Sequence, residues 1–326
     1  MDPDELRLLN EAVTVLTEEW DGAQLTSTLD AFGWAELLEG HPQEAISAVF
    51  SAQGKAGTWS SALHDVLASD LGTIGIAHDP TCCVVLPWPR SPVPGHWRAG
   101  QIEVRGLLLR PRFEASTLVV PVGDGSGIRC VISVRSDEVR TQPRVGLDRA
   151  LDAREVTGTL ATEDVVADGD AARKWWALAE AKGRLALCHQ MAAGLFVAVE
   201  MARSHVSERS QFGRLVGTFQ AVRHKLVEAH VAATAADCSA TAAWEADQLS
   251  LGAMTAKVVG GKAVSVGMAN TQQLLAGIGF TAEHPYHRYM KRVVSLERVL
   301  GSGGDLAPLL GGELIAAASA PRLFEL

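Results

Sequence analysis

Two segments in the last third of the chain hold residue types that suit nucleotide binding. The first runs from Arg209 to Gln220. An arginine guanidinium can form two parallel hydrogen bonds with a pyrophosphate. Phe212 offers a flat apolar face, and Gly213 allows the backbone to turn tightly. Gln211 and Gln220 can each donate and accept hydrogen bonds, as contact with an adenosine or a ribitol requires.

The second segment runs from Gln273 to Pro285. Gln273 can reach a polar group. Gly277 and Gly279 lack side chains, so another backbone or a diphosphate can approach closely. Each feature alone has an ordinary structural interpretation, because an Ala-Gly-x-Gly turn is typical of a helix C-cap. The two segments together point more strongly to a ligand.

Jointly, the two segments resemble the acyl-CoA dehydrogenase family. The family patterns are R-x-x-F-G followed by F-Q, and Q-x-x-G-G-x-G-[YF]-x-x-E-x-P; the chain reads RSQFGRLVGTFQ and QLLAGIGFTAEHP. The resemblance covers Trp175 to Leu300 and is only architectural before that. It implies the following FAD contacts: Arg209, Gln211, Phe212, Gly213, Gln220, Gln273, Ala276 and Gly277.

In the family, FAD lies across a subunit interface. The flavin ring contacts the β domain and helical bundle of one subunit, and the two loops of its neighbour hold the ADP half and the pyrophosphate. The reaction removes the α-proton of an acyl-CoA thioester and passes a β-hydride to the flavin. Because that proton is weakly acidic, the site needs a positioned carboxylate and hydrogen bonds to the thioester oxygen.

This chain lacks the family's carboxylate at both of its usual places. The E-G-T segment after the second loop reads Leu300-Gly301-Ser302 here. The alternative place, 29 residues before Phe212, is Gly183. Glu180 and Glu297 lie about one helical turn from these points, and we expect them to be helix-surface residues rather than bases.

The flavin-ring half also departs from the family. The T-E-x-x-x-G-S-D-like loop corresponds to Cys82–Pro89, and the strand Val104–Leu109 is apolar where polar flavin contacts are expected. The N-terminal helical region is shorter than usual. The resemblance therefore implies that the loops serving a neighbour are kept, whereas the half serving the chain's own site is lost.

A chain with one half of a site needs a partner that carries the other. The sequence resembles the short subunit of actinobacterial α2β2 acyl-CoA dehydrogenases, in which a paralogous larger subunit carries the glutamate and binds the acyl-CoA. Those enzymes act on bulky thioesters such as sterol side-chain CoA esters. Two alternatives stay open: a self-sufficient flavoenzyme with a relocated base (Glu180 or Glu297), and a non-catalytic scaffold that no longer binds FAD.

The elements that position these loops follow from periodicity. Apolar residues recur at three and four positions in residues 1–71, which predicts a domain of three or four helices. Residues 72–170 contain short β-rich runs and predict an antiparallel barrel or sandwich. Residues 171–326 predict a four-helix-type bundle. The fold class is therefore α+β and mainly helical.

The expected segments can be stated by residue. Strands are predicted at Cys82–Leu86, Ile102–Leu109, Ser116–Val122, Cys130–Val134 and Glu155–Leu160, with a hairpin loop at Gly123–Gly127. Long helices are predicted at Trp175–Ser207, Leu215–Ala246, Leu249–Ala276, Pro285–Leu300 and Leu306–Ala320.

Composition narrows the class of protein. The 326 residues include 29 Lys and Arg and 38 Asp and Glu, for a net charge of −9, so the chain has no general attraction for nucleic acid or an anionic membrane. It has no run of eighteen uncharged apolar residues, which argues against a membrane span. Five cysteines without a C-x-x-C pattern indicate buried thiols in a reducing cytoplasm.

Two weaker motifs are set aside. Gly260-Gly261-Lys262 is followed by alanine, and no strand precedes it, so it does not fit a phosphate-binding P-loop. His284 and His287 could share a metal ion, but a third ligand is not evident, and we expect no metal.

Overall fold

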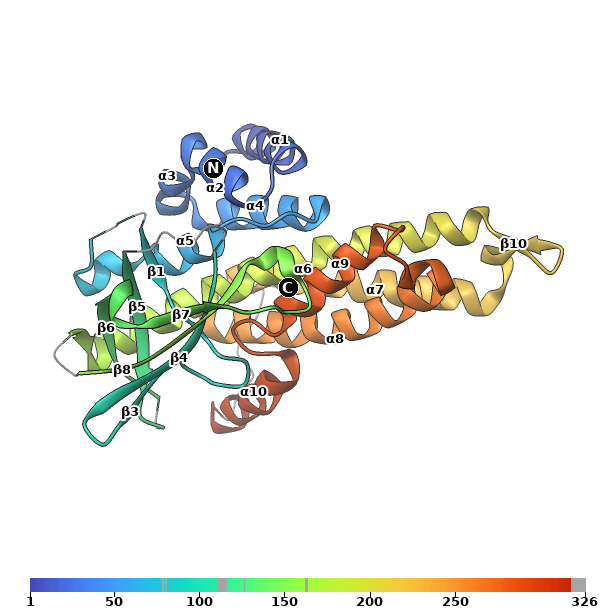
Figure 1. Ribbon diagram of the computed structural model, residues 1–326. Coiled ribbons are helices and arrows are strands. Elements are labelled where there is room, and N and C mark those ends of the chain that lie inside the picture. Colours follow the sequence, from blue (N-terminus) through green and yellow to red (C-terminus); the bar gives the residue numbers. More distant parts are fainter. Residues whose placement is uncertain (78, 80, 111–115, 126, 162–163, 318–326) are drawn as a thin grey trace.

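The computed structural model describes residues 1–77, 79, 81–110, 116–125, 127–161 and 164–317. Helices, a sheet and a helical bundle follow one another along the chain (Figure 1). The sheet lies at one end of the bundle, and the N-terminal helices pack along one side of the bundle. The expected α+β, mainly helical fold class is confirmed.

The N-terminal region forms five helices rather than three or four. Gly33 adopts φ +89°, a left-handed conformation that glycine tolerates, and it separates two of them. Pro42 starts the next helix at a position where its missing N–H costs nothing. The helices are α1 (Pro3–Glu19), α2 (Gly22–Phe32), α3 (Trp34–Gly40), α4 (Pro42–Ala56) and α5 (Ala62–Ala68).

The central sheet is mixed. Most of its pairings are antiparallel, as expected, but β1 and β3 both pair in parallel with β5. The order of the main path is β7-β8-β4-β3-β5-β6-β9, with β1 beside β5 and β2 beside β4. The strands are β1 (Cys82–Val84), β2 (Leu86–Pro87), β3 (Gly95–Arg98), β4 (Gln101–Leu109), β5 (Thr117–Gly123), β6 (Ile128–Arg135), β7 (Arg140–Pro143), β8 (Ala153–Leu160) and β9 (Val165–Asp168).

The sheet has its own small core. Ile102, Val104, Leu118, Val120 and Ile132 are all buried in this apolar cluster. In β4 the residues from 101 to 106 alternate between exposed and buried, which is the period-2 pattern that made this strand predictable. Strands β3, β7 and β9 were missed because each has four residues and carries polar side chains or proline.

The C-terminal bundle is built on long helices. Helix α7 begins at Gln220 rather than Leu215, because a small hairpin and a 3-10 turn occupy the intervening residues. Of the helix predicted at Leu306–Ala320, residues 318–320 lie outside the described residues. The elements are α6 (Gly169–Glu208), β10 (Ser210–Gln211), β11 (Arg214–Leu215), α7 (Gln220–Ala242), α8 (Leu249–Leu275), α9 (Tyr286–Glu297) and α10 (Gly303–Ala317).

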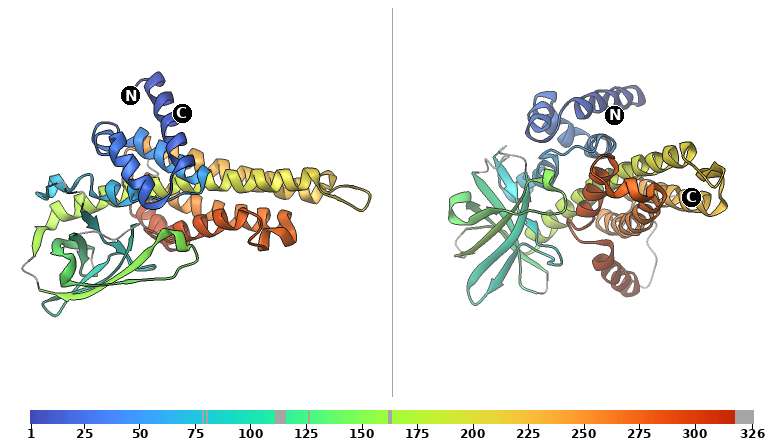
Figure 2. Two further views of the ribbon diagram at one scale, coloured as in Figure 1. Left: turned by 45° about the horizontal axis from the view of Figure 1, so that its top comes forward. Right: turned by 45° about the vertical axis from the view of Figure 1, so that its right-hand side comes forward.

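Helix α6 is the axis of the molecule. It packs against α4, α5, α7, α8 and α9 and against the sheet at β6 (Figures 1 and 2). Among the described residues it is also the one helix long and apolar enough to cross a membrane by length and composition, and 78% of that apolar window is buried inside the protein. Its apolar character is thus used in packing against other elements of the chain.

Helices α4 and α6 cross with almost no space between their backbones. A Cβ atom on Gly54 of α4 would lie 2.4 Å from the carbonyl oxygen of Gln190 and 2.7 Å from Cβ of Ala193, both in α6. Contacts this short do not occur in real structures, so the crossing requires glycine. The N-terminal helices are therefore seated on α6 through this point.

A buried histidine joins α5 to two strands. The backbone N–H of Leu109 donates to Nε2 of His64 over 3.0 Å, and Nδ1 of His64 donates to the carbonyl oxygen of Val84 over 3.1 Å. Trp59 Nε1 donates to the carbonyl oxygen of Leu109 over 3.2 Å. Burial, aided by nearby Arg110, lowers the pKa of His64 to about 3, so the ring is neutral in the folded protein.

The Gly54 crossing predicts a large effect for one added methyl group. We expect Gly54→Ala to lower the free energy of unfolding by about 2 kcal/mol, because the methyl group has no space. Gly40→Ala is the matched control, since nothing lies within 4 Å of its Cβ position. Urea denaturation measures both. Equal stability of the two variants would contradict the packing described.

The His64 bridge predicts a specific pH dependence of stability. The folded-state pKa lies below the unfolded value of 6.5, so the stabilisation is complete above pH 6.5 and is lost as the pH falls toward 3. Between pH 7.5 and 5.0 this loss amounts to about 2 kcal/mol. Urea unfolding at both pH values measures this loss. Between pH 7.5 and 5.0, the free energy of unfolding of His64→Gln should fall by about 2 kcal/mol less than that of the unaltered chain. His224→Gln, at an exposed position of α7, should behave like the unaltered chain.

Candidate functional site

The first candidate loop forms the tip of the α6–α7 hairpin, at the end of the bundle farthest from the sheet (Figure 1). Strands β10 and β11 pair antiparallel, and Phe212 and Gly213 form the two-residue turn with φ of +55° and +76°. Two positive φ values characterise the turn type that best fits a tight hairpin. Arg209 ends α6, where its backbone N–H donates to the carbonyl oxygen of His205 over 3.1 Å.

Phe212 is presented to the outside. Its side chain is 92% exposed, and its ring contacts Phe219 edge-on with centroids 6.3 Å apart. The Arg214 guanidinium lies 4.0 Å from the Phe219 ring centroid. These contacts stabilise the turn while leaving most of the Phe212 ring uncovered, so it can stack on a ligand or pack on another subunit.

The second candidate loop follows α8 and contains the 3-10 turn Ala276–Phe280. Nothing lies within 4 Å of a Cβ position on Gly277, which leaves open space beside the backbone. Gly279 is needed for packing, since a Cβ there would lie 2.5 Å from Gln272 Nε2. Ala276 adopts φ +51°, which is strained for alanine.

The two loops share one end of the molecule. Burial lowers the pKa of His205, in the last turn of α6, and the nearby positive charges of Arg209 and His284 lower it further. His205 thus lies close to residues of both loops. The candidate FAD contacts are all exposed here: Arg209, Gln211, Phe212, Gly213, Gln220, Gln273, Ala276 and Gly277. Their assignment as FAD contacts stays a prediction.

Three polar side chains of these loops are exposed and available to a ligand. Within the part of the chain that the structure describes, the side chains of Arg209, Gln211 and Gln273 form no hydrogen bond or ion pair. An exposed guanidinium, two exposed amides and an exposed aromatic ring are the groups that the ADP half of a dinucleotide binds. The donor set therefore suits that half of FAD.

The two expected base positions meet in space. A Cβ atom on Gly183 would lie 2.7 Å from Cδ1 of Leu300 and 3.0 Å from Cδ2 of Leu67. Leu300 is 2% exposed, and Arg184 Nε donates to its carbonyl oxygen over 3.0 Å. The two positions predicted for the base, residues 183 and 300, thus lie side by side in the fold. The side chains of Leu300 and Leu67 fill the space there.

The neighbouring carboxylates are held in structural contacts. Glu180 forms a 2.7 Å ion pair with Arg184; burial raises its pKa, and Arg184 opposes that rise. Glu297 accepts a 2.8 Å hydrogen bond from the backbone N–H of Gly303, at the start of α10, and pairs with Arg298. Our expectation that both are exposed helix-surface residues does not hold, because each is largely buried: their side chains are 18% and 12% exposed.

The described residues of the flavin-ring half are buried or already hydrogen-bonded. Cys82, Cys83 and Val84 are buried in β1, and both backbone groups of Leu109 at the end of β4 are bonded by Trp59 and His64. These two hydrogen bonds to the backbone of Leu109 could not be predicted from the sequence, because their partners are 45 and 50 positions away along the chain. Within the described parts of the chain, β1 and the end of β4 do not offer the polar contacts that a flavin ring needs.

The two halves of the chain are too far apart to form one site. Gly183 and Arg209 lie on the same helix, roughly 40 Å apart at 1.5 Å per residue. The loops point away from the sheet (Figure 1). The loops and the expected base position of one chain therefore do not lie within one site.

Among the residues that the structure describes, no group of three or more His, Cys, Asp or Glu side chains is placed to hold a metal ion. Nδ1 of His287 instead hydrogen-bonds to the carbonyl oxygen of His284 over 2.8 Å.

Comparison with known proteins agrees with the motifs. Residues 179–304 match the family described as "Acyl-CoA dehydrogenase, C-terminal domain". A stretch of 112 residues is 37% identical to the acyl-CoA dehydrogenase FadE34 of Mycobacterium tuberculosis, covering 32% of this chain and 16% of that protein. The match thus spans less than a fifth of that relative's length.

Two solved structures resemble the whole chain. One is the ChsE4-ChsE5 complex from Mycobacterium tuberculosis, with a TM-score of 0.74 and 20% identity over 99% of both chains. The other is the Tcur3481-Tcur3483 steroid ACAD G363A variant, with a TM-score of 0.75 and 19% identity over 97% of this chain and 99% of that one. The chain therefore has the acyl-CoA dehydrogenase fold, and residues 179–304 of its C-terminal bundle match the C-terminal domain of that family.

Proposed function

We propose that this chain is a subunit of a heteromeric, FAD-dependent acyl-CoA dehydrogenase, and that it lends its two loops to an FAD site in a paralogous larger subunit. One observation carries the proposal. The side chains of Arg209, Gln211 and Gln273 are exposed at the C-terminal end of α6 and have no hydrogen-bond or ion-pair partner among the described residues. Leu300 and Leu67, by contrast, fill the base position at Gly183, 26 residues before the arginine. Only a second subunit can unite such halves.

Each loop residue has a defined part in this proposal. Arg209 would bind the pyrophosphate, because a guanidinium matches two phosphoryl oxygens. Phe212 would cover an apolar face of the adenosine, and Gln211 and Gln273 would satisfy its polar edge. Bound FAD supplies the electron acceptor for α,β-dehydrogenation of the thioester.

The partner would supply what this chain lacks. A thioester α-proton needs a carboxylate base, and neither Leu300 nor Gly183 can accept a proton. The larger subunit would therefore carry the catalytic glutamate, the flavin-ring contacts and the acyl-CoA site. In an α2β2 assembly, each such chain would complete one FAD site.

The substrate class is inferred from the structural neighbours. One is a complex of two named chains, and the other is named a steroid ACAD. We infer a bulky substrate, such as a sterol side-chain CoA thioester. The free cysteines among the described residues, four of them buried, fit a cytoplasmic protein.

Two alternatives are less well supported. A self-sufficient enzyme would need Glu180 or Glu297 as its base, but Arg184 neutralises the first and the second caps α10. A scaffold without FAD would have no need for unpaired polar side chains on two adjoining loops. The scaffold alternative thus leaves the exposed loop residues without a role, and the self-sufficient alternative lacks a free carboxylate base.

Purification of the chain alone and with its larger partner tests the proposal directly. We expect the lone chain to bind no FAD and to have no acyl-CoA dehydrogenase activity. The complex should contain fewer flavins than chains, as measured by absorbance and quantitative mass spectrometry. Stoichiometric FAD and turnover in the lone chain would favour the self-sufficient alternative.

Substitution of the loop arginine tests its contact with FAD. We expect Arg209→Gln to weaken FAD binding by the complex about 10- to 100-fold, because a hydrogen bond between charged groups contributes roughly 1.5–3 kcal/mol. Arg203→Gln is the control, since Arg203 is an exposed residue of α6 paired with Glu200. Unchanged flavin content and activity in Arg209→Gln would instead favour the scaffold.

A further inference from the structure

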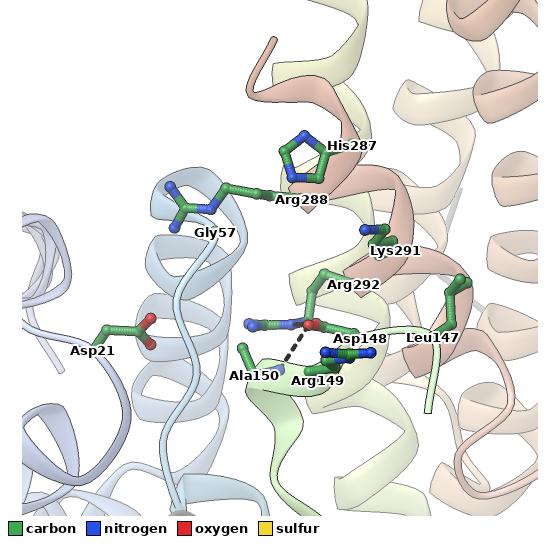
Figure 3. Close-up of a pocket in the computed structure, with 10 residues that line it drawn as sticks. All are labelled: Asp21, Gly57, Leu147, Asp148, Arg149, Ala150, His287, Arg288, Lys291 and Arg292. Carbon is green, nitrogen blue, oxygen red and sulfur yellow. Dashed lines mark hydrogen bonds and ion pairs between the residues drawn. The ribbon is translucent and has the colours of Figure 1, made fainter. Parts of the chain in front are cut away.

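A small cavity lies away from the candidate FAD contacts (Figure 3). Its volume is about 210 Å³, and none of its lining residues belongs to the two loops proposed to bind FAD. It is formed where α9 meets the end of α4, the connection between α1 and α2, and the segment between β7 and β8. Four parts of the chain distant in sequence thus converge on it.

Four cationic side chains line this cavity, and three of them lie outside the buried ion pair at its floor. Arg149 comes from the β7–β8 connection, and Arg288 and Lys291 come from α9 (Figure 3). Within the described ranges of the chain, none of the three has an ion-pair partner. The chain as a whole has a net charge of −9, so this is a local reversal of charge. Clustered cations repel one another unless an anion lies between them.

The floor of the cavity is rigid and polar. Arg292 Nε donates to Asp148 Oδ2, and Nη1 donates to the carbonyl oxygen of Thr58. The two side chains of this ion pair are only 6% and 11% exposed. Asp148 also accepts a 3.1 Å hydrogen bond from the backbone N–H of Ala150, which fixes the turn that carries Arg149. The buried pair of Arg292 and Asp148 therefore positions Arg149 at the rim of the cavity.

The two acids at the cavity do not cancel its charge. Arg292 neutralises Asp148. Oδ1 of Asp21 accepts hydrogen bonds of 2.8 Å from the backbone N–H groups of Gly22 and Trp59. The remaining lining residues include three cations, Arg149, Arg288 and Lys291, and one carboxylate, Asp21, so the lining keeps an excess of two positive charges.

We propose that this cavity binds a phosphoryl dianion, either as inorganic pyrophosphate or as the terminal phosphate of a soluble phosphate ester. An excess of two positive charges matches a phosphoryl group, which carries about two negative charges, better than it matches a monocarboxylate. The volume of about 210 Å³ is below the range of roughly 300–1,000 Å³ for drug-sized ligands. The phosphoryl end alone would enter, and the rest of the ester would stay outside. This site is independent of the proposed FAD role.

Calorimetric titration of inorganic pyrophosphate into the full chain, at physiological salt, tests the proposal. We expect saturable binding with one site per chain. The Arg288→Gln and Lys291→Gln double variant should lose at least tenfold in affinity. The matched control is the double variant of Lys174→Gln and Lys262→Gln, which removes the same charge at exposed positions of α6 and α8. An unchanged melting temperature checks folding in both.

Further arms separate the sources of the anion. We expect ADP to bind with the same sensitivity to Arg288→Gln and Lys291→Gln, and succinate not to compete. Absence of saturable pyrophosphate binding, or an equal loss in the control variant, would overturn the site. Equal binding of succinate would overturn its phosphoryl specificity. Binding to vesicles containing phosphatidic acid, without binding of ADP, would overturn the soluble ligand in favour of a lipid headgroup.

Discussion

The burial of the middle of α6, where residues 181–195 are covered on all sides, is the constraint on which the rest of the structure depends. Helices of both helical regions and the sheet bury their apolar faces against this one helix. Close approach requires small residues at the contacts. A Cβ atom on Gly54 of α4 would collide with α6, and one on Gly194 of α6 would lie 2.7 Å from Val293 of α9. The helix therefore sets the distance and direction between the sheet and the loops.

Much of the fold could be predicted from the sequence, because helical periodicity is a local property. For helices α6 to α9, most of the predicted ends lie within a few residues of the observed ends. The mixed sheet was predicted less well, because strands such as β3 and β7 are short and polar and are held by pairing with distant strands. The hairpin at Phe212 was missed as structure, since its two strands have two residues each.

The candidate site was predictable only in part. The loop residues could be named from motifs, and so could the missing base at Leu300. The contact between Leu300 and Gly183 depends on packing across residues more than a hundred positions apart. The basic cavity had no signal in the sequence, since Arg149 and Arg288 come together only when the β7–β8 connection reaches α9.

The exposed rings at the loop end have a consequence for the cell. Phe212 is 92% exposed and Phe280 79%, so an unassembled chain shows apolar surface that an assembled one would cover. A surplus of this subunit would then be a target for chaperones and proteases. If the proposed assembly is correct, synthesis of the two subunits has to be matched in amount, and one operon encoding both would achieve that balance.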